Sequence, residues 1–351
     1  MNNEEILLLS PSDVQGLLTM DECIVAVEHA FRVYGEGKAH LPAVLSLHTA
    51  DGGFHVKAGL LELSQPYFAA KVNGNFPENP KRFGLPTIQG VIVLCNAERG
   101  NPLAVMDARD ITSLRTAAAT AVAAKYLARR DSHTVTICGC GNQGRVQLKA
   151  ISRVRPLRRV FAYDTSELQA ARFVQDMKED LGLPITVASN LAAAVRQSDL
   201  CVTCTTSRQP LLGPDDSVPG LFIAAVGADN PAKQEIHPAL MAKSKIVADI
   251  FEQCVAMGDL HHALEAGSVT RSDVHAELGE IVAGKKVGRE SEEEIIIFDS
   301  TGMALQDVAA AALVYEKAQK QGAGFRFSLA AQAVLPAPTM SSLPDRTKSA
   351  K

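Results

Sequence analysis

The chain has 351 residues, which suggests about two domains at ~150 residues per domain. Hydrophobic residues make up 46% of the chain and charged residues 21%, an ordinary composition that excludes a mostly disordered or a fibrous protein. A net charge of −4, without any basic cluster, disfavours nucleic acid as a partner.

The sequence shows no targeting signal, and this absence and the pattern of cysteines predict a cytoplasmic protein. No apolar run approaches the ~20 residues of a membrane-spanning helix, and the acidic start Met1–Glu5 lacks the basic region of a signal peptide. The seven cysteines are odd in number and scattered, which is typical of reduced thiols. Cys201 and Cys204 have CxxC spacing but lie in an apolar run without a second pair, so we expect core packing and no metal site.

The first 130 residues combine helical and strand patterns. Apolar residues at helical spacing predict a helix over residues 21–36, and an Ala-rich run predicts a long helix over residues 112–130. Short apolar runs between turn formers predict strands at Ile6–Leu9, Val44–His48, Phe54–Ala58, Tyr67–Asn73, Thr87–Asn96 and Pro102–Asp107.

From residue 133 onward, strands and helices alternate, which predicts a parallel sheet covered on both faces. Helices are expected up to residue 154 after the first strand, and then over 167–181, 191–197 and 238–243. A last helix is expected at Asp299–Gln319. The expected strands are His133–Cys138, Arg159–Tyr163, Ile185–Val187, Leu200–Thr205, Leu221–Val226 and Lys245–Asp249.

The segment Gly139–Gly144 is a complete GxGxxG motif between a strand and a helix. Its glycines permit a tight turn, close approach of a pyrophosphate and close helix packing, and the helix N-terminus offers N–H groups to the phosphates. Asp164 ends the next strand, 20 residues past Gly144, where a carboxylate bonds a ribose 2′-hydroxyl and repels a 2′-phosphate. The pattern predicts a dinucleotide-binding domain that prefers NAD, although Arg145 leaves NADP possible.

Three further polar residues lie in apolar surroundings. Lys71 follows an apolar strand, and Arg115 is the only charge on the first turns of an apolar helix. Asp229 follows a buried strand, at the end where doubly wound folds place ligands. From residue types alone, each has a structural alternative; Asp229 is either a general acid/base or the cap of a following helix.

Six segments carry a combined pattern that none of them shows alone: Lys71–Pro77, Leu85–Gly90, Asp107–Ala119, Gly139–Gly144, Val226–Glu235 and Phe298–Asp307. Together, and in this order, they resemble the ornithine cyclodeaminase/mu-crystallin family. The family includes cyclodeaminases, archaeal-type alanine dehydrogenases, and ketimine or Δ1-pyrroline-2-carboxylate reductases. The resemblance implies an enzyme that moves a hydride between a nicotinamide and the α-carbon of an amino or imino acid.

The resemblance also implies roles for individual residues. Lys71 matches a lysine near the substrate carboxylate, Asp229 matches the acid/base carboxylate, and Thr301 lies where family members approach the substrate. Cofactor contacts are expected, from the glycine motif and the resemblance, at Thr87, Arg115, Thr116, Gly139, Gly141, Asn142, Gln143, Gly144, Asp164, Thr205, Val226, Lys233 and Ser300.

One departure from the family pattern bears on the reaction. Cyclodeaminases of the family usually carry Arg or Lys at the position of Val44, and use it on the substrate carboxylate. Lys57 either replaces that cation from the adjacent strand or is a solvated strand residue. The departure disfavours strict ornithine cyclisation, and later segments resemble the dehydrogenase and reductase branch. His275 and Glu277, within one such segment, are expected to be structural.

We therefore expect an α/β protein. Residues 120–305 are predicted to form a doubly wound Rossmann domain, and residues 1–119 with 306–334 an α+β substrate-binding and dimerisation domain, followed by a disordered tail at 335–351. The expected function is an NAD(P)-dependent amino-acid dehydrogenase or imino-acid reductase. The alternatives are ornithine cyclodeaminase, which yields proline and ammonia with NAD recycled, and a mu-crystallin-like small-ligand-binding protein. The resemblance implies a homodimer, without nucleic acid or membrane as a partner.

Overall fold

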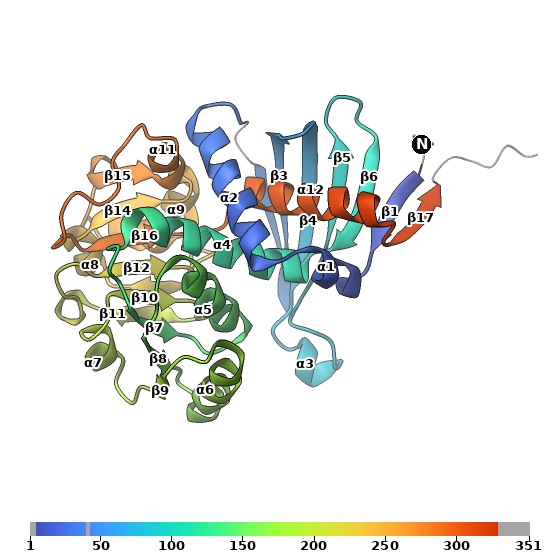
Figure 1. The fold of residues 1–351 in the computed structure, drawn as a ribbon. Helices are drawn as coiled ribbons and strands as arrows, with labels where there is room; N and C mark the ends of the chain where they lie inside the picture. Colours follow the sequence, from blue (N-terminus) through green and yellow to red (C-terminus); the bar gives the residue numbers. More distant parts are fainter. Residues whose placement is uncertain (1–4, 40–42, 329–351) are drawn as a thin grey trace, which may run out of the picture.

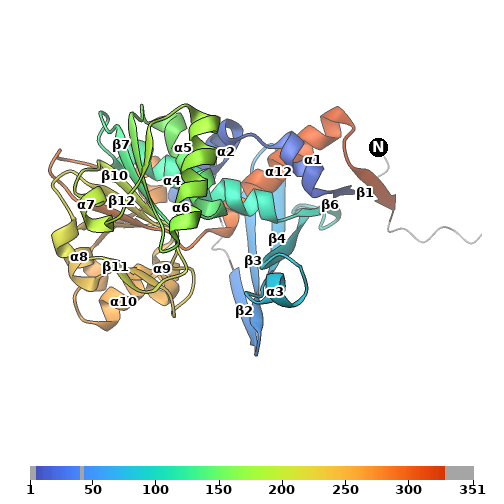
Figure 2. The same ribbon diagram turned by 90° about the horizontal axis from the view of Figure 1, so that it is seen from below.

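The structure, a computed structural model, describes residues 5–39 and 43–328. The tail predicted at 335–351 lies outside the described residues. Two large sheets stand side by side, with α2 (Met20–Gly35), α4 (Arg109–Leu127) and α12 (Ala304–Gln321) packed between and across them (Figures 1 and 2). Within the described ranges, none of the helices has both the length and the hydropathy required to cross a membrane.

The first sheet is mostly antiparallel and has seven strands. Its central strands run up and down in chain order, and among the described residues the last strand pairs with the first. In spatial order the strands are β17 (Phe325–Ser328), β1 (Glu5–Leu9), β6 (Pro102–Asp107), β5 (Ile88–Asn96), β4 (Pro66–Asn75), β3 (Gly52–Glu62) and β2 (Ala43–Thr49).

The second sheet is entirely parallel and has eight strands, as the alternation of strands and helices predicted. The sequence analysis missed its strands β15 and β16. In spatial order the strands are β15 (Val274–Glu277), β14 (Lys245–Ala248), β16 (Ile296–Asp299), β12 (Phe222–Ala225), β10 (Leu200–Thr203), β7 (Thr134–Cys138), β8 (Arg159–Tyr163) and β9 (Ile185–Val187).

The remaining elements are shorter. A two-stranded sheet pairs β11 (Arg208–Leu212) with β13 (Gln234–Ile236). Single 3₁₀ turns lie at Pro214–Asp216 and Arg271–Asp273. The other helices are α1 (Pro11–Leu17), α3 (Asn79–Arg82), α5 (Asn142–Val154), α6 (Glu167–Leu181), α7 (Leu191–Val195), α8 (Pro238–Lys243), α9 (Phe251–Met257), α10 (Asp259–Glu265) and α11 (Leu278–Val282).

The parallel sheet is buried on both faces, which explains its continuous apolar strands. Within β10, Leu200 and Val202 pack into the core shared with α4 and α5, whereas Cys201 points into a second core on the opposite face. Cys201 is fully buried, as predicted, but Cys204 lies just beyond the strand and is half-buried. All seven cysteines are free thiols.

The helix expected at Asp299–Gln319 begins later than predicted. Residues up to Asp299 belong to β16, whose apolar side chains are buried between β12 and β14, and α12 begins only at Ala304. The four residues between them form a loop at the carboxyl end of the strand. Helix α12 then leaves the parallel sheet and packs on β3 and β4 of the seven-stranded sheet (Figure 1).

The two faces of the seven-stranded sheet differ sharply. Side chains alternate along each strand, so residues in register share a face. One face, under α12, carries Lys57 and Lys71 side by side in register. The opposite face exposes apolar side chains of β2 to β5, namely Leu45, Leu47, Phe54, Val72 and Val91.

Candidate active site

One pocket of about 270 Å³ lies at the carboxyl ends of β10, β12 and β16. The strand order reverses between β7 and β10, and doubly wound folds bind ligands at this switch point. Strands β3 and β4 of the other sheet form the opposite wall. The lining brings together residues predicted from the sequence, namely Lys57, Lys71, Arg115, Thr116, Gln143, Thr205, Val226, Asp229, Lys233, Ser300 and Thr301.

The glycine turn beside this pocket has the shape that a dinucleotide phosphate requires. Gly139 has a φ of 103°, and a Cβ on Gly144 would lie 2.1 Å from the Gly139 carbonyl oxygen, so both positions need glycine. A Cβ on Gly141 would meet nothing within 4 Å, which leaves the backbone open to a ligand. No side chain of the described residues caps the N-terminus of α5 at Asn142, so its first N–H groups face outward for an anion. These features fit a bound pyrophosphate.

Asp164 lies against the same turn. Its carboxylate accepts hydrogen bonds from the backbone N–H groups of Cys140 (2.8 Å) and Ser166 (2.9 Å). Arg145, the cation that left NADP possible, donates to the Asp176 carboxylate at 2.7 Å and to the Cys140 carbonyl at 2.7 Å. Because this guanidinium is already engaged, the surroundings of Asp164 favour an unphosphorylated ribose.

Two cations share one buried carboxylate in the pocket wall. Lys71 Nζ lies 2.9 Å from Asp307 Oδ1, and Arg115 Nε donates to the same oxygen at 3.0 Å. All three residues are buried, and Asp307 Oδ2 has no hydrogen-bond partner among the described residues. Lys57 lies directly opposite Lys71 in the sheet and adds a third cation. The wall therefore carries an excess of positive charge that suits a carboxylate ligand.

This crowding of cations acts mainly on Lys71. Desolvation and the charge of Arg115 lower the pKa of Lys71 to about 7, and Asp307 opposes this only in part. Desolvation would raise the pKa of Asp307, but Arg115 and Lys71 outweigh it and hold that pKa below its usual value. Since a guanidinium stays protonated, we assign the negative charge to Asp307 and the titrating proton to Lys71.

Lys57 faces the pocket rather than solvent. Its Nζ donates to the carbonyl oxygens of Thr301 (2.9 Å) and Gly302 (2.8 Å), and desolvation lowers its pKa. In the register of β2 and β3 its direct partner is Val44, the position where family cyclodeaminases carry a cation. Directly opposed residues of an antiparallel pair present their side chains on one face. Lys57 therefore brings a cation next to the position that lacks one.

Asp229 lies on the opposite side of the pocket from these lysines, in the loop after β12. Its Oδ1 is 2.7 Å from Lys233 Nζ. Desolvation opposes ionisation, but the charge and hydrogen bond of Lys233 outweigh it and lower the pKa of the Asp229 carboxyl. No helix begins after Asp229, because the next element is β13, so the reading of this residue as a helix cap is wrong.

Two buried acids that the sequence analysis left without a role hold the pocket loops. Glu235 accepts hydrogen bonds from the backbone N–H groups of Thr205 (2.6 Å) and Gly227 (2.8 Å), and so ties the loop after β10 to the loop after β12. Asp249 accepts from the Gly302 N–H at 2.6 Å. Asp249 could have been singled out from the sequence, because it is a single acid at the end of an apolar strand. No comparable pattern marks Glu235.

Thr87 is absent from the pocket lining, and several residues that do line the pocket were not predicted. Thr87 accepts a backbone hydrogen bond from Phe76 at 2.8 Å, and its neighbour Ile88 reaches the pocket lining, so a Thr87 contact with cofactor stays a prediction. Three missed polar residues, His55, Asn73 and Asn75, could have been found from side-chain alternation along β3 and β4, because they share a face with Lys57 and Lys71. The lining residues without a predicted role are His55, Asn73, Asn75, Ile88, Thr112, Cys204, Thr206, Gly227, Asn230 and Gly302.

Known proteins share both the sequence and this fold. The chain matches the ornithine cyclodeaminase/mu-crystallin family over residues 4–322. Alanine dehydrogenase of Archaeoglobus fulgidus is 43% identical over 320 residues, 91% of this chain and 97% of that protein. An archaeal alanine dehydrogenase dimer with bound NAD superposes with a TM-score of 0.88 at 43% identity, covering 93% of this chain and 99% of that one. For Thermococcus litoralis Δ1-pyrroline-2-carboxylate reductase in complex with NADH and L-proline, the TM-score is 0.87 at 36% identity, with 91% and 99% covered. The chain therefore belongs to the ornithine cyclodeaminase/mu-crystallin family, as its motifs predicted.

Proposed function

We propose that the protein is an NAD-dependent oxidoreductase that moves a hydride to or from the α-carbon of a small amino or imino acid. The reaction is that of an alanine dehydrogenase or of a cyclic ketimine or Δ1-pyrroline-2-carboxylate reductase. The observation that carries this proposal is the single pocket that joins Lys57, Lys71 and Asp229 beside a glycine turn suited to a pyrophosphate. Relatives named alanine dehydrogenase and pyrroline-2-carboxylate reductase, solved with NAD or NADH, support it.

Some residues of the pocket bind the substrate, and another transfers a proton. A bound nicotinamide supplies the hydride donor or acceptor for the substrate α-carbon. Lys71 and Lys57 hold the substrate carboxylate through charge-assisted hydrogen bonds. Asp229, kept ionised by Lys233, accepts the proton of the substrate amine in the oxidative direction and returns it in the reductive one. Glu235 and Asp249 keep the surrounding loops in place.

Ornithine cyclodeaminase is the alternative that one observation favours. Lys57 stands beside Val44 and supplies the cation that cyclodeaminases use on the substrate carboxylate. In that reaction the δ-amine of the substrate attacks the imine carbon, the α-nitrogen leaves as ammonia, and hydride return to the new cyclic imine leaves no net oxidation. A mu-crystallin-like binding protein is less well supported, because Lys71, Arg115 and Asp229 all remain in one pocket.

One assay separates these functions. Purified protein is tested for NADH formation with alanine, ornithine, lysine and proline, and for NADH oxidation with cyclic imines. We expect net NADH turnover with at least one of these substrates. Proline and ammonia formed from ornithine with catalytic NAD, and no accumulation of NADH, identifies the cyclodeaminase instead. No turnover in either assay contradicts both enzymes and leaves the binding protein.

We further propose that the protein is a cytoplasmic homodimer. The exposed apolar face of β2 to β5 borders a hollow of about 800 Å³ lined by Phe54, Val72 and Val91, and a contiguous apolar face of this kind is typical of an interface. A relative solved as an alanine dehydrogenase dimer supports this assembly. Seven free cysteines suit a reducing compartment. In this assembly, residues 1–119 with 306–334 bind substrate and dimerise, and residues 120–305 bind the dinucleotide.

A further inference from the structure

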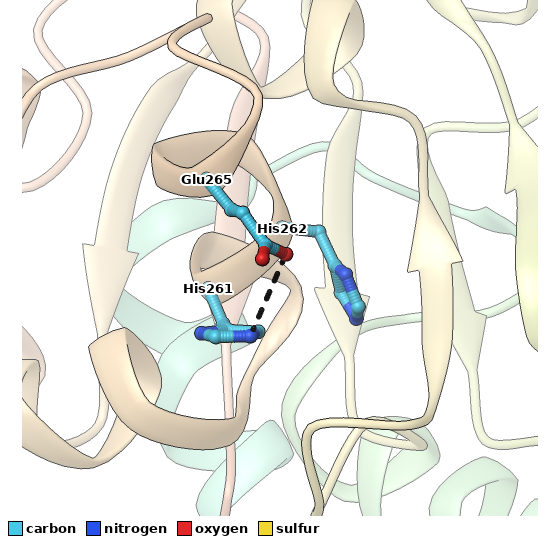
Figure 3. A group of neighbouring side chains, drawn as sticks. All are labelled: His261, His262 and Glu265. Atoms are coloured by element: carbon cyan, nitrogen blue, oxygen red, sulfur yellow. Dashed lines mark ion pairs between the residues drawn. The ribbon is translucent and has the colours of Figure 1, made fainter.

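Helix α10 carries a cluster of potential metal ligands outside the pocket. One ligand atom from each of His261, His262 and Glu265 lies within 4.8 Å of the other two. Glu265 follows His261 by four residues and His262 by three, and residues at these spacings are neighbours on a helix surface. Figure 3 shows the Glu265 carboxylate directed toward the ring of His261, with the ring of His262 on the other side of the carboxylate.

Each histidine of this cluster already uses one ring nitrogen as a donor. His261 Nδ1 is 3.0 Å from the carbonyl oxygen of Val255, and His262 Nε2 is 2.9 Å from that of Lys233. A carbonyl oxygen only accepts hydrogen bonds, so both of these nitrogens carry hydrogen. The other nitrogen of each neutral ring then has a free lone pair. A ring anchored through its second N–H to a backbone carbonyl is the arrangement found for histidines that bind metal ions.

The contact between His261 and Glu265 offers two ligand atoms to a cation. His261 Nε2 lies 3.9 Å from a carboxylate oxygen of Glu265. With the ring neutral, its lone pair and the carboxylate both present electron pairs to the space between them, where a metal ion can bind both. Two imidazoles and one carboxylate are a ligand set that Zn²⁺ accepts, with water in the fourth position.

We propose that His261, His262 and Glu265 form a binding site for one Zn²⁺ ion. Tetrahedral coordination brings ligand atoms to ~3.3 Å from one another, so the cluster must contract on binding. The Glu265 side chain is 73% exposed and can move inward without losing buried contacts. The two histidine rings are held by their hydrogen bonds to carbonyl groups, so most of the movement is expected from Glu265.

The proposed zinc site is attached to a wall of the pocket. His262 holds the carbonyl of Lys233, whose ammonium pairs with Asp229. Asp259, at the start of the same helix, accepts hydrogen bonds from the N–H groups of Glu235 (2.7 Å) and Ile236 (2.8 Å). Helix α10 therefore holds the segment from Lys233 onward, and a bound ion would fix one of these attachments. The zinc site does not depend on the proposed reaction.

Zinc titration of the full chain tests the proposal. Protein freed of metal with a chelator is titrated calorimetrically with zinc chloride at about pH 7.5, where histidine is neutral. We expect one equivalent to bind, and His261→Gln, His262→Gln and Glu265→Gln each to weaken the affinity at least ~10-fold. His29→Gln, on the exposed side of α2, is the matched control and should bind as the wild type does. Affinity should also fall at about pH 5.5, because protonated imidazole cannot bind the ion.

Two further measurements keep the result unambiguous. Cys204→Ser must leave the stoichiometry unchanged, because Cys204 is a partly exposed thiol in the pocket lining and a competing ligand for zinc. The melting temperature of His261→Gln without zinc should stay near that of the wild type, which separates lost ligands from lost folding. The proposal is overturned if the histidine variants bind zinc as the wild type does. Absence of saturable binding by the wild type also overturns it.

Discussion

Lys71 and Arg115 share the single negative charge of Asp307, and this sharing governs the chemistry of the pocket at the scale of the residue. Below its pKa of about 7, Lys71 is protonated and can hold a substrate carboxylate. We therefore expect the KM of the amino or imino acid to rise as the pH rises through 7. Asp307→Asn removes the charge that supports the proton, so the rise in KM should begin at lower pH. Initial-rate profiles of both proteins check this, and identical profiles would contradict it.

Lys71 and Asp229 should have separable effects on turnover. Lys71→Ala removes an ion pair present in both ground and transition states, so it should mainly raise KM. Asp229→Asn removes the proton acceptor and should mainly lower kcat, by ~10²–10⁴-fold. Steady-state kinetics measure both, with the affinity for NAD and the melting temperature of Asp229→Asn as controls that should stay near wild type. Near-normal kcat in Asp229→Asn would assign the proton transfer to another group, with Lys57 and Lys71 the next candidates.

Asp164 should set the choice between the two nicotinamide cofactors. We expect kcat/KM to be higher with NAD than with NADP, because the carboxylate repels a 2′-phosphate and Arg145 is engaged with Asp176. Asp164→Ser should narrow this ratio, whereas Glu167→Gln, a nearby acid at the exposed start of α6, should not. A wild-type preference for NADPH would show that another cation reaches the ribose.

At the scale of the element, the turn between β7 and α5 depends on a contact too close for any side chain. A Cβ on Gly144 would lie 2.1 Å from the Gly139 carbonyl oxygen, so Gly144→Ala must push the helix from the strand. Overpacking of this kind typically costs ~1–3 kcal/mol, and the displaced helix should bind NAD more weakly. Thermal melting and NAD titration measure the two effects. Gly16→Ala in α1, where a Cβ meets nothing within 4 Å, is the control that should not destabilise.

Elements were predictable where periodicity was strong, and not where several short elements follow one another. The strands Pro102–Asp107 and Arg159–Tyr163 and the helix Glu167–Leu181 have the predicted bounds, because apolar runs and turn residues delimit them. The short helices α9 to α11 escaped prediction because a helix of one or two turns shows too little periodicity; α7 and α8, which are as short, were found because each lies between two predicted strands. Pocket residues that belong to recognisable motifs were predicted. The role of Asp307 was not, because its ion pair with Lys71 is a long-range contact that no local pattern shows.

At the scale of the whole molecule, the exposed face of β2 to β5 should decide the oligomeric state. We expect light scattering to give the mass of a dimer. Leu47→Asp, which places a charge on that face, should yield monomers because an unpaired charge would be buried in the interface. Val25→Asp, an exposed apolar residue on α2 outside this face, should remain dimeric. A monomeric wild type, or a dimeric Leu47→Asp, would place the interface elsewhere or remove it.

The passage of α12 from one sheet to the other has a consequence for the order of events during synthesis. Strands β3 and β4, with Lys57 and Lys71, leave the ribosome early, but Asp307 follows them by more than two hundred residues. Until α12 docks, the lysine ammonium groups have no carboxylate to accompany them into the interior, and burying them alone is costly. The face of β3 and β4 that carries these lysines must therefore stay hydrated until synthesis has reached α12, which is nearly the whole chain. Loss of α12 would accordingly leave a nascent protein that exposes the sheet face with Lys57 and Lys71 and is prone to aggregation, rather than a smaller stable protein.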